Sequence, residues 1–158
     1  MNATHLHLLL NHIPVFGVFF AVFLLAVGYW LKSQAFKTTA MFVTVVASLL
    51  TFAVMQTGEA AEDAVEKIAG VTEAAIHDHE EAAEFAQITM YLAGAVAAAG
   101  LVFRKREKIY NMAAMGLLVV GLFGFAVVAR TNYLGGYIRH AQEFGTTPQP
   151  GGVEQDDD

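Results

Sequence analysis

Four long apolar segments constrain this chain more strongly than any other feature of its sequence. They run from about residue 8 to 31, 38 to 56, 85 to 103 and 109 to 129. An α-helix needs about 20 apolar residues to cross a hydrocarbon core about 30 Å thick. Lipid offers no hydrogen-bond partners, so each segment must satisfy its own backbone as a helix. The pattern predicts an all-α bundle of four transmembrane helices.

The composition agrees with a membrane protein and excludes several kinds of site. Hydrophobic residues make up 56% of the chain and charged residues 15%, and soluble domains have about 25% charged residues. The chain has no cysteine, which excludes disulfides, iron–sulfur clusters, cysteine nucleophiles and covalently attached c-type haem. A net charge of −6 argues against nucleic acid as a partner.

The distribution of charge predicts the orientation of the helices. Two short links, residues 32–37 and 104–108, hold six of the nine Lys and Arg residues but only one of the fifteen acids. By the positive-inside rule these links are cytoplasmic, which places both termini outside the cytoplasm of a bacterial inner membrane. Residues 1–10 contain no Lys or Arg, so the first span is expected to be retained and not cleaved as a signal peptide.

The polar segments outside the spans are expected to form a helical outer hairpin and a tail. The second helix is predicted to continue through residues 60–68 until Gly70, with Thr72 as the N-cap of the third helix. The fourth helix is predicted to end near Gly135-Gly136, before a short amphipathic piece over 137–144. Residues 145–158 are rich in Pro, Gly and Asp and are expected to be a disordered acidic tail, which leaves 1–144 as the one folded domain.

Histidines and acids from all four helices are predicted to meet at the outer end of the bundle. His12 lies about one turn inside an apolar helix, where ionisable residues are costly and are usually functional. His7 and His12 are five residues apart, or about 140° on an ideal helix, so they cannot both face one ion from a straight helix. His5 lies near the N-terminus and His77 lies among charged residues, so both are interpreted as surface residues.

Four motifs resemble those of a group of small bacterial membrane proteins of unknown function. They are His7-x4-His12-Ile-Pro14, Thr57-Gly58-Glu59-x-Ala61-Glu62, His79-Glu80 and Gly135-Gly136-x-Ile138-Arg139-His140. The resemblance covers nearly the whole chain except the tail. It implies that the site residues are His7, His12, Glu59, Glu62, His79, Glu80 and His140. It also implies a link to cytochrome-type electron carriers, alongside or fused to which such proteins are often found.

The first hypothesis for function is a haem b protein that transfers electrons near the outer face. Haem needs an apolar slot between helices and one or two axial imidazoles. His12 and His79 are the preferred axial pair, and His7 with His140 is a second pair. Arg130 or Arg139 would bind a haem propionate through a charged hydrogen bond. Quinone or a soluble cytochrome would be the redox partner.

Two alternatives remain open. The first is a non-haem centre for zinc, iron or manganese, for which imidazole and carboxylate are suitable ligands. Its candidate ligands are His12, Glu59, Glu62, His79, Glu80 and His140. The second is a non-catalytic subunit that packs against partner helices or another copy of this chain. Hydrolytic chemistry is disfavoured, since the chain has no Gly-x-Ser-x-Gly motif and its only serines, Ser33 and Ser48, lie far from the histidines.

Overall fold

The computed structural model describes residues 3–67 and 70–141, and this part of the chain is entirely helical apart from its turns. The predicted tail over 145–158 lies outside the described residues, as does the end of the predicted amphipathic piece. The helices are α1 (Ala3–Leu10), α2 (His12–Trp30), α3 (Gln34–Glu59), α4 (Glu62–Val65), α5 (Glu73–Val102) and α6 (Glu107–Arg139).

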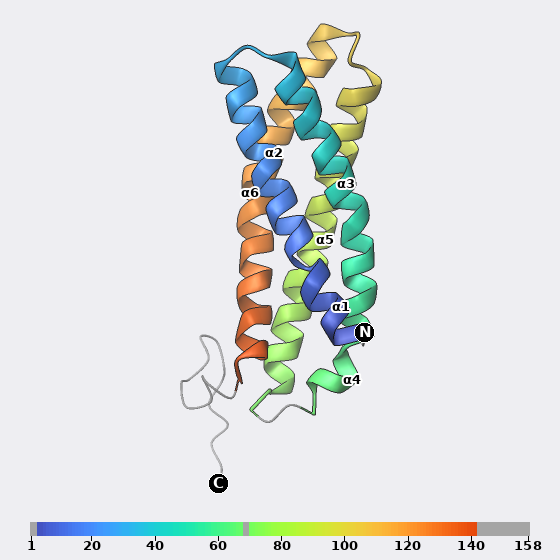
Figure 1. Cartoon of the computed structure of the whole chain (residues 1–158), viewed down its shortest axis with the longest axis vertical. Coiled ribbons are helices and arrows are strands. Elements are labelled where there is room, and N and C mark those ends of the chain that lie inside the picture. Colours follow the sequence, from blue (N-terminus) through green and yellow to red (C-terminus); the bar gives the residue numbers. More distant parts are fainter. Residues whose placement is uncertain (1–2, 68–69, 142–158) are drawn as a thin grey trace.

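Four long helices form an up-and-down bundle (Figure 1). α2 packs against α3 and α6, and α5 packs against the same two helices, so α2 and α5 lie on a diagonal. The four helical segments, with α1 and α2 taken together, are long and apolar enough to cross a membrane. The two short links that contain most of the basic residues lie at one end, here called the basic end. α1, α4 and the end of α6 lie at the other, here called the histidine end (Figure 1).

The boundaries of the helices agree with the sequence at some points and differ at others. Thr72 caps α5 as predicted, because its Oγ1 accepts a hydrogen bond from the Ala75 backbone N–H at 3.2 Å. The predicted continuation of the second helix over 60–68 is wrong for residues 60–67, the part of it that the structure describes, since α3 ends at Glu59 and the short α4 is the one helix in that part. Gly70 turns the chain with a φ of 87°, a conformation that glycine adopts without steric cost.

The predicted end of the fourth helix at Gly135-Gly136 is also wrong, because α6 continues to Arg139. Glycine within a helix costs only about 1 kcal/mol relative to alanine, so tertiary contacts can easily override it. One such contact is present, because Gly135 lies directly against the ring of His79 on α5.

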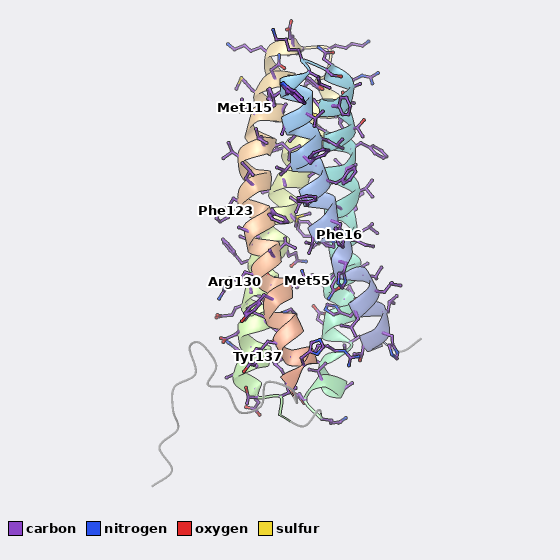
Figure 2. All side chains as sticks on the ribbon, turned by 60° about the vertical axis from the view of Figure 1, so that its left-hand side comes forward. Phe16, Met55, Met115, Phe123, Arg130 and Tyr137 are labelled. Carbon is purple, nitrogen blue, oxygen red and sulfur yellow. The ribbon has the colours of Figure 1, made fainter. Side chains whose placement is uncertain are left out.

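Small residues hold the helices close together and leave the large apolar residues facing outward. A Cβ on Gly17 would lie 2.6 Å from the Ala47 Cβ, so α2 and α3 approach closely there, as small residues allow in membrane bundles. Buried threonines satisfy their hydroxyls within their own helix, as when Thr51 Oγ1 donates to the Ala47 carbonyl at 3.0 Å. Phe16 and Phe123 are 64% and 55% exposed and project from the outside of the bundle (Figure 2).

The basic end is closed by a buried polar cluster. Lys37 was predicted to lie in the link, but it is part of α3, and only 9% of its surface is exposed. Its Nζ lies 4.1 Å from the centre of the Tyr29 ring and donates a hydrogen bond to Asn111 Oδ1 at 3.4 Å. Tyr110 Oη donates to the Gln34 carbonyl at 3.0 Å. These contacts fix α3 and α6 to each other at the end of the bundle farthest from the histidines.

Candidate functional site

The histidine end of the bundle contains a cavity of about 300 Å³. It forms beside Asn11, the residue between α1 and α2, where the chain changes direction. On one side of Asn11, α1 packs chiefly against α3, and on the other side α2 packs against both α3 and α6. The cavity is therefore lined by residues from α1, α3, α4, α5 and α6, together with Asn11 and Ala61. These include Thr4, His7, Met55, Gly58, Glu59, Glu62, Ile76, His79, Glu80, Glu84, Gly135 and Arg139. We call this space the outer cavity.

A smaller cavity of about 50 Å³ continues from it toward the middle of the bundle. The two spaces share His7, Asn11, Met55, His79 and Ala83, so these residues form the boundary between them. The rest of this inner cavity is lined by apolar and neutral polar side chains: Pro14, Thr51, Val54, Ala86, Gln87, Met90, Val128, Thr131 and Asn132. All the carboxylates and the one arginine that line these spaces therefore belong to the outer cavity.

His7 is held in a fixed orientation by α3. Its Nδ1 lies 3.1 Å from the carbonyl oxygen of Val54 and 3.4 Å from Thr57 Oγ1. A carbonyl oxygen can only accept a hydrogen bond, so Nδ1 carries the proton and Nε2 keeps its lone pair in the neutral ring. The ring lies against Gly58, where an added Cβ would be 3.2 Å from His7 Cε1.

His79 is held by α6 in a matching way. Its Nδ1 lies 3.1 Å from the carbonyl oxygen of Thr131, which again assigns the proton to Nδ1. The ring lies against Gly135, where an added Cβ would be 3.0 Å from His79 Cε1. The Thr131 hydroxyl also donates to the Ala82 carbonyl at 2.9 Å, which ties α6 to α5 next to this histidine.

The helix pair α1 and α3 and the helix pair α5 and α6 thus repeat one local arrangement. In each, a histidine donates from Nδ1 to a backbone carbonyl of the neighbouring helix, and its ring lies on a glycine four residues after that carbonyl. A hydrogen bond at Nδ1 sets the tautomer and leaves Nε2 for a ligand, which is how metal-binding histidines are usually oriented. His7 and His79 therefore enter the same pair of cavities as two oriented imidazoles with Nε2 available.

The charges around the outer cavity are mostly negative. Four glutamates line it, and Arg139 is the one Lys or Arg side chain among the residues that line it. Glu59, Glu80 and Glu84 are exposed and Glu62 is half-buried, so water screens their mutual repulsion. A cavity with this charge balance attracts cations and resists anions other than those that Arg139 can pair.

Asn11 contributes a buried acceptor at the boundary between the two cavities. Among the buried side-chain polar atoms that the structure describes, Asn11 Oδ1 alone has no hydrogen-bond partner. Asparagine at this position usually caps the following helix, but here its side chain makes no capping hydrogen bond to α2. An unpaired buried acceptor costs about 1–3 kcal/mol, and no donor for this atom is present among residues 3–67 and 70–141 as the structure describes them.

The structure brings together some of the residues predicted for the site and separates others. His7, Glu59, Glu62, His79, Glu80 and Arg139 line the outer cavity. His12 does not: it is exposed on the other side of the helix, its ring lies 6.3 Å from that of Phe16, and its Nδ1 bonds to the Leu8 carbonyl of its own chain segment. His12 and His79, the expected axial pair, therefore do not lie on one cavity, whereas His7 and His79 do.

The other expected pair, His7 with His140, is separated as well. His140 is the C-cap residue of α6, is exposed, and does not line either cavity. Arg130 is exposed on the outside of α6 (Figure 2). Arg139 lies nine residues farther along the helix, about two and a half turns, and lines the outer cavity. Because α6 continues past Gly135-Gly136, Arg139 lines the outer cavity, whereas His140 lines neither cavity.

The sequence analysis assigned no role to Asn11, Gly58 or Gly135. Gly58 and Gly135 are named in two of its motifs, and Asn11 lies between His7 and His12 of the first motif. A signal was present for the glycines, because a glycine in a helix next to a functional motif often marks a close approach by another group. Asn11 offered a weaker signal, since an asparagine beside a histidine in an apolar helix is also explained by a helix cap.

Comparison of the chain with protein-family models, with curated proteins and with solved structures finds no match. Within residues 3–67 and 70–141, no group of three or more His, Cys, Asp or Glu side chains is arranged to hold a metal ion. The function proposed below therefore rests on the geometry of His7, His79 and the residues around them.

Proposed function

We propose that this protein is a membrane haem b protein in which His7 and His79 are the two axial ligands. The observation that carries the proposal is the pair of imidazoles on one cavity, each with Nδ1 fixed to a backbone carbonyl and Nε2 left for iron. Haem sites in helix bundles use histidines from facing helices in this manner. Bound haem would supply a one-electron couple, and the protein would act as an electron carrier.

The number of oriented ligands favours haem over a non-haem ion. A porphyrin supplies four of the six iron ligands, so two histidines complete the set. A non-haem zinc site usually needs three or four protein donors held in place, and the histidines that line these cavities are the two anchored imidazoles of His7 and His79. Arg139 would pair with a propionate, and Met55, Ile76 and Ile138 would supply apolar contacts within the outer cavity.

A non-haem metal centre is the second candidate, and two observations favour it. Four glutamates line the cavity, and a haem has no use for them, whereas manganese, iron or zinc binds carboxylate readily. The volume of about 300 Å³ also lies at the lower limit of ligand pockets, which span roughly 300–1,000 Å³. Here His7 and His79 would be joined by Glu62 on α4 or Glu80 on α5, two of the four glutamates that line the cavity.

Absorption spectra and metal analysis of one detergent-purified sample separate these candidates. Haem b predicts a Soret band that shifts and sharpens when dithionite reduces the protein, with α and β bands and one iron for each haem. Stoichiometric iron, zinc or manganese without a Soret band would reject haem and support the second candidate. A sample with neither would reject both, and a subunit role beside partner helices or another copy would then remain.

We further propose that the histidine end faces away from the cytoplasm of a bacterial inner membrane. The basic links at the opposite end support this orientation through the positive-inside rule. Electrons would then be exchanged near the outer surface, with a quinone in the lipid or a soluble cytochrome as the partner. A haem beside exposed glutamates would present an acidic surface to such a partner, and a basic patch on a cytochrome would complement it.

Single cysteines test the orientation cleanly because the natural chain has none. Ala74→Cys places a thiol at the histidine end and Gln34→Cys places one at the basic end, both at exposed positions. We expect a membrane-impermeant maleimide to label Ala74→Cys in intact cells and Gln34→Cys only after the membrane is permeabilised. Labelling of Gln34→Cys alone in intact cells would reverse the proposed orientation.

A further inference from the structure

The basic end of the bundle contains a buried positive charge that has no part in the proposed haem site. The stem of Lys37 packs on Gly28, and its Nζ lies over the Tyr29 ring and donates to Asn111 Oδ1. Buried charges are usually paired with an opposite charge, but both of these described partners are neutral. Because a buried charge is screened much less than an exposed one, Lys37 makes the protein surface around it electropositive.

Lys32 adds an exposed charge at the end of α2, at a position that favours glycine. The N–H of Lys32 donates to the Tyr29 carbonyl at 3.3 Å, and the N–H of Ser33 donates to the Gly28 carbonyl at 2.9 Å. These are the two hydrogen bonds of a Schellman C-cap, in which the residue at the position of Lys32 has a positive φ and is usually glycine. Lys32 has a φ of 53° and an exposed side chain, so the fold accepts backbone strain at a residue whose charge faces outward.

The packing of α2 against α6 brings a third lysine to the same level. We call the line along which these two antiparallel helices pack the α2–α6 seam. Tyr29 Oη donates to the Asn111 carbonyl at 3.4 Å, which fixes the register at the basic end of the seam. Three residues farther along α2 lies Lys32, and three residues earlier on α6 lies Lys108, which is also exposed. Glu107 is the one acid in the two basic links, so the three lysines keep a net positive charge.

We propose that Lys32, Lys37 and Lys108 form a binding site for the headgroup of an anionic phospholipid at the basic end of the α2–α6 seam. The phosphate lies between the exposed ammonium groups of Lys32 and Lys108, and the buried charge of Lys37 attracts it without direct contact. Clusters of Lys and Arg at the ends of transmembrane helices bind anionic headgroups in this way.

The residues next to the lysines favour a lipid over a soluble anion. Trp30 is 82% exposed at the end of α2, and tryptophan is enriched at the level of lipid headgroups. Farther from the basic end, Phe23 on α2 and Met115 on α6 are 53% and 49% exposed and would contact the acyl chains. A soluble anion would use the charges alone, whereas a phospholipid uses the charges together with this apolar surface.

The single tryptophan of the chain allows a direct test, because Trp30 lies two residues from Lys32. Bromine on an acyl chain quenches the fluorescence of a tryptophan that the lipid contacts. The purified protein is placed in phosphatidylcholine vesicles that contain increasing fractions of brominated phosphatidylglycerol, which is anionic, or of brominated phosphatidylcholine, which is zwitterionic. Each fluorescence value is divided by that in the same vesicles without bromine, so any quenching by bound haem cancels.

We expect the anionic lipid to bind beside Trp30 about fivefold more tightly than the zwitterionic lipid, the effect of about one lysine charge near an anionic headgroup. Lys32→Gln and Lys108→Gln should each lower this preference, and the double variant should lower it to about twofold or less. Lys67→Gln is the matched control, because it removes an exposed lysine at the histidine end, and it should leave the preference unchanged.

Equal quenching of wild-type Trp30 by the two lipids would reject the lipid site and leave these lysines to an acidic protein partner. A preference that survives in the double variant, or that Lys67→Gln lowers as much as Lys32→Gln does, would reject the assignment to the three lysines. The wild-type comparison requires no variant to fold. These outcomes are independent of the spectra that test the proposed function, because the lysines lie at the opposite end of the bundle from the histidines.

Discussion

His79→Ala protein is expected to purify without haem, whereas His77→Ala protein should keep its full complement. His79 lines both cavities and is anchored to the Thr131 carbonyl, but His77, two residues earlier on α5, is exposed and does not line either cavity. The same contrast should hold on α1, where His7→Ala loses haem and His5→Ala retains it. The measurement is the ratio of haem absorbance to protein for each variant after purification in detergent.

A variant could lose haem because an iron ligand is missing or because the fold is damaged. A rescue experiment distinguishes these two causes. In His79→Ala the space beside Gly135 that the ring occupied is free, and its shape is that of an imidazole. Added imidazole should therefore restore haem binding in His79→Ala when haem is supplied, and it should not change His77→Ala. Full haem in His79→Ala without imidazole would remove His79 from the ligand set.

Gly135→Ala is expected to weaken haem retention by about 10- to 100-fold, the range found when groups that orient a metal ligand are changed. The added Cβ would lie 3.0 Å from His79 Cε1, closer than carbon atoms pack at about 3.5–4.0 Å. The ring is fixed by its hydrogen bond to Thr131, so it can only yield by tilting or by breaking that bond. Retention is measured as the rate at which haem transfers from the protein to an excess of an acceptor protein.

Gly136→Ala is the matched control for this prediction. It lies next in the same helix, and an added Cβ there meets nothing within 4 Å. Both substitutions gain the same helix propensity of about 1 kcal/mol, so propensity cancels from the comparison. Equal haem transfer from the two variants would show that the contact between Gly135 and His79 does not position the ligand.

The four helices were predictable because each depends on the apolar residues of its own segment. Each span contains enough consecutive apolar residues to be identified without knowledge of its neighbours, and the structure confirms four helices able to cross a membrane. The ends of the helices were less predictable, because tertiary contacts decide them. α6 continues through Gly135-Gly136, and the ring of His79 packs on Gly135. The sequence shows the two glycines, but it does not show that a histidine of another helix packs against one of them.

The sequence predicted the end of the bundle at which the histidines and glutamates gather, but not which of them line the cavity. The sequence located the gathering of histidines and glutamates at one end, and helical geometry required His7 and His12 to face different directions. It could not determine which of the two faces inward, because that depends on the change of direction at Asn11 and on the packing of α1 against α3. The preference for His12 rested on its depth in an apolar helix, but an exposed histidine stacked near Phe16 satisfies the same pattern.

Low-temperature electron paramagnetic resonance of the oxidised, haem-loaded protein tests the central claim most directly. If His7 and His79 are both axial ligands, the ferric iron is six-coordinate and gives a low-spin bis-imidazole signal. Replacement of either histidine by alanine should abolish that low-spin signal, and the same replacement of His12 should leave it unchanged. A high-spin signal in the wild-type protein, or a low-spin signal that His12→Ala abolishes, would contradict the assignment of His7 and His79 as the axial pair.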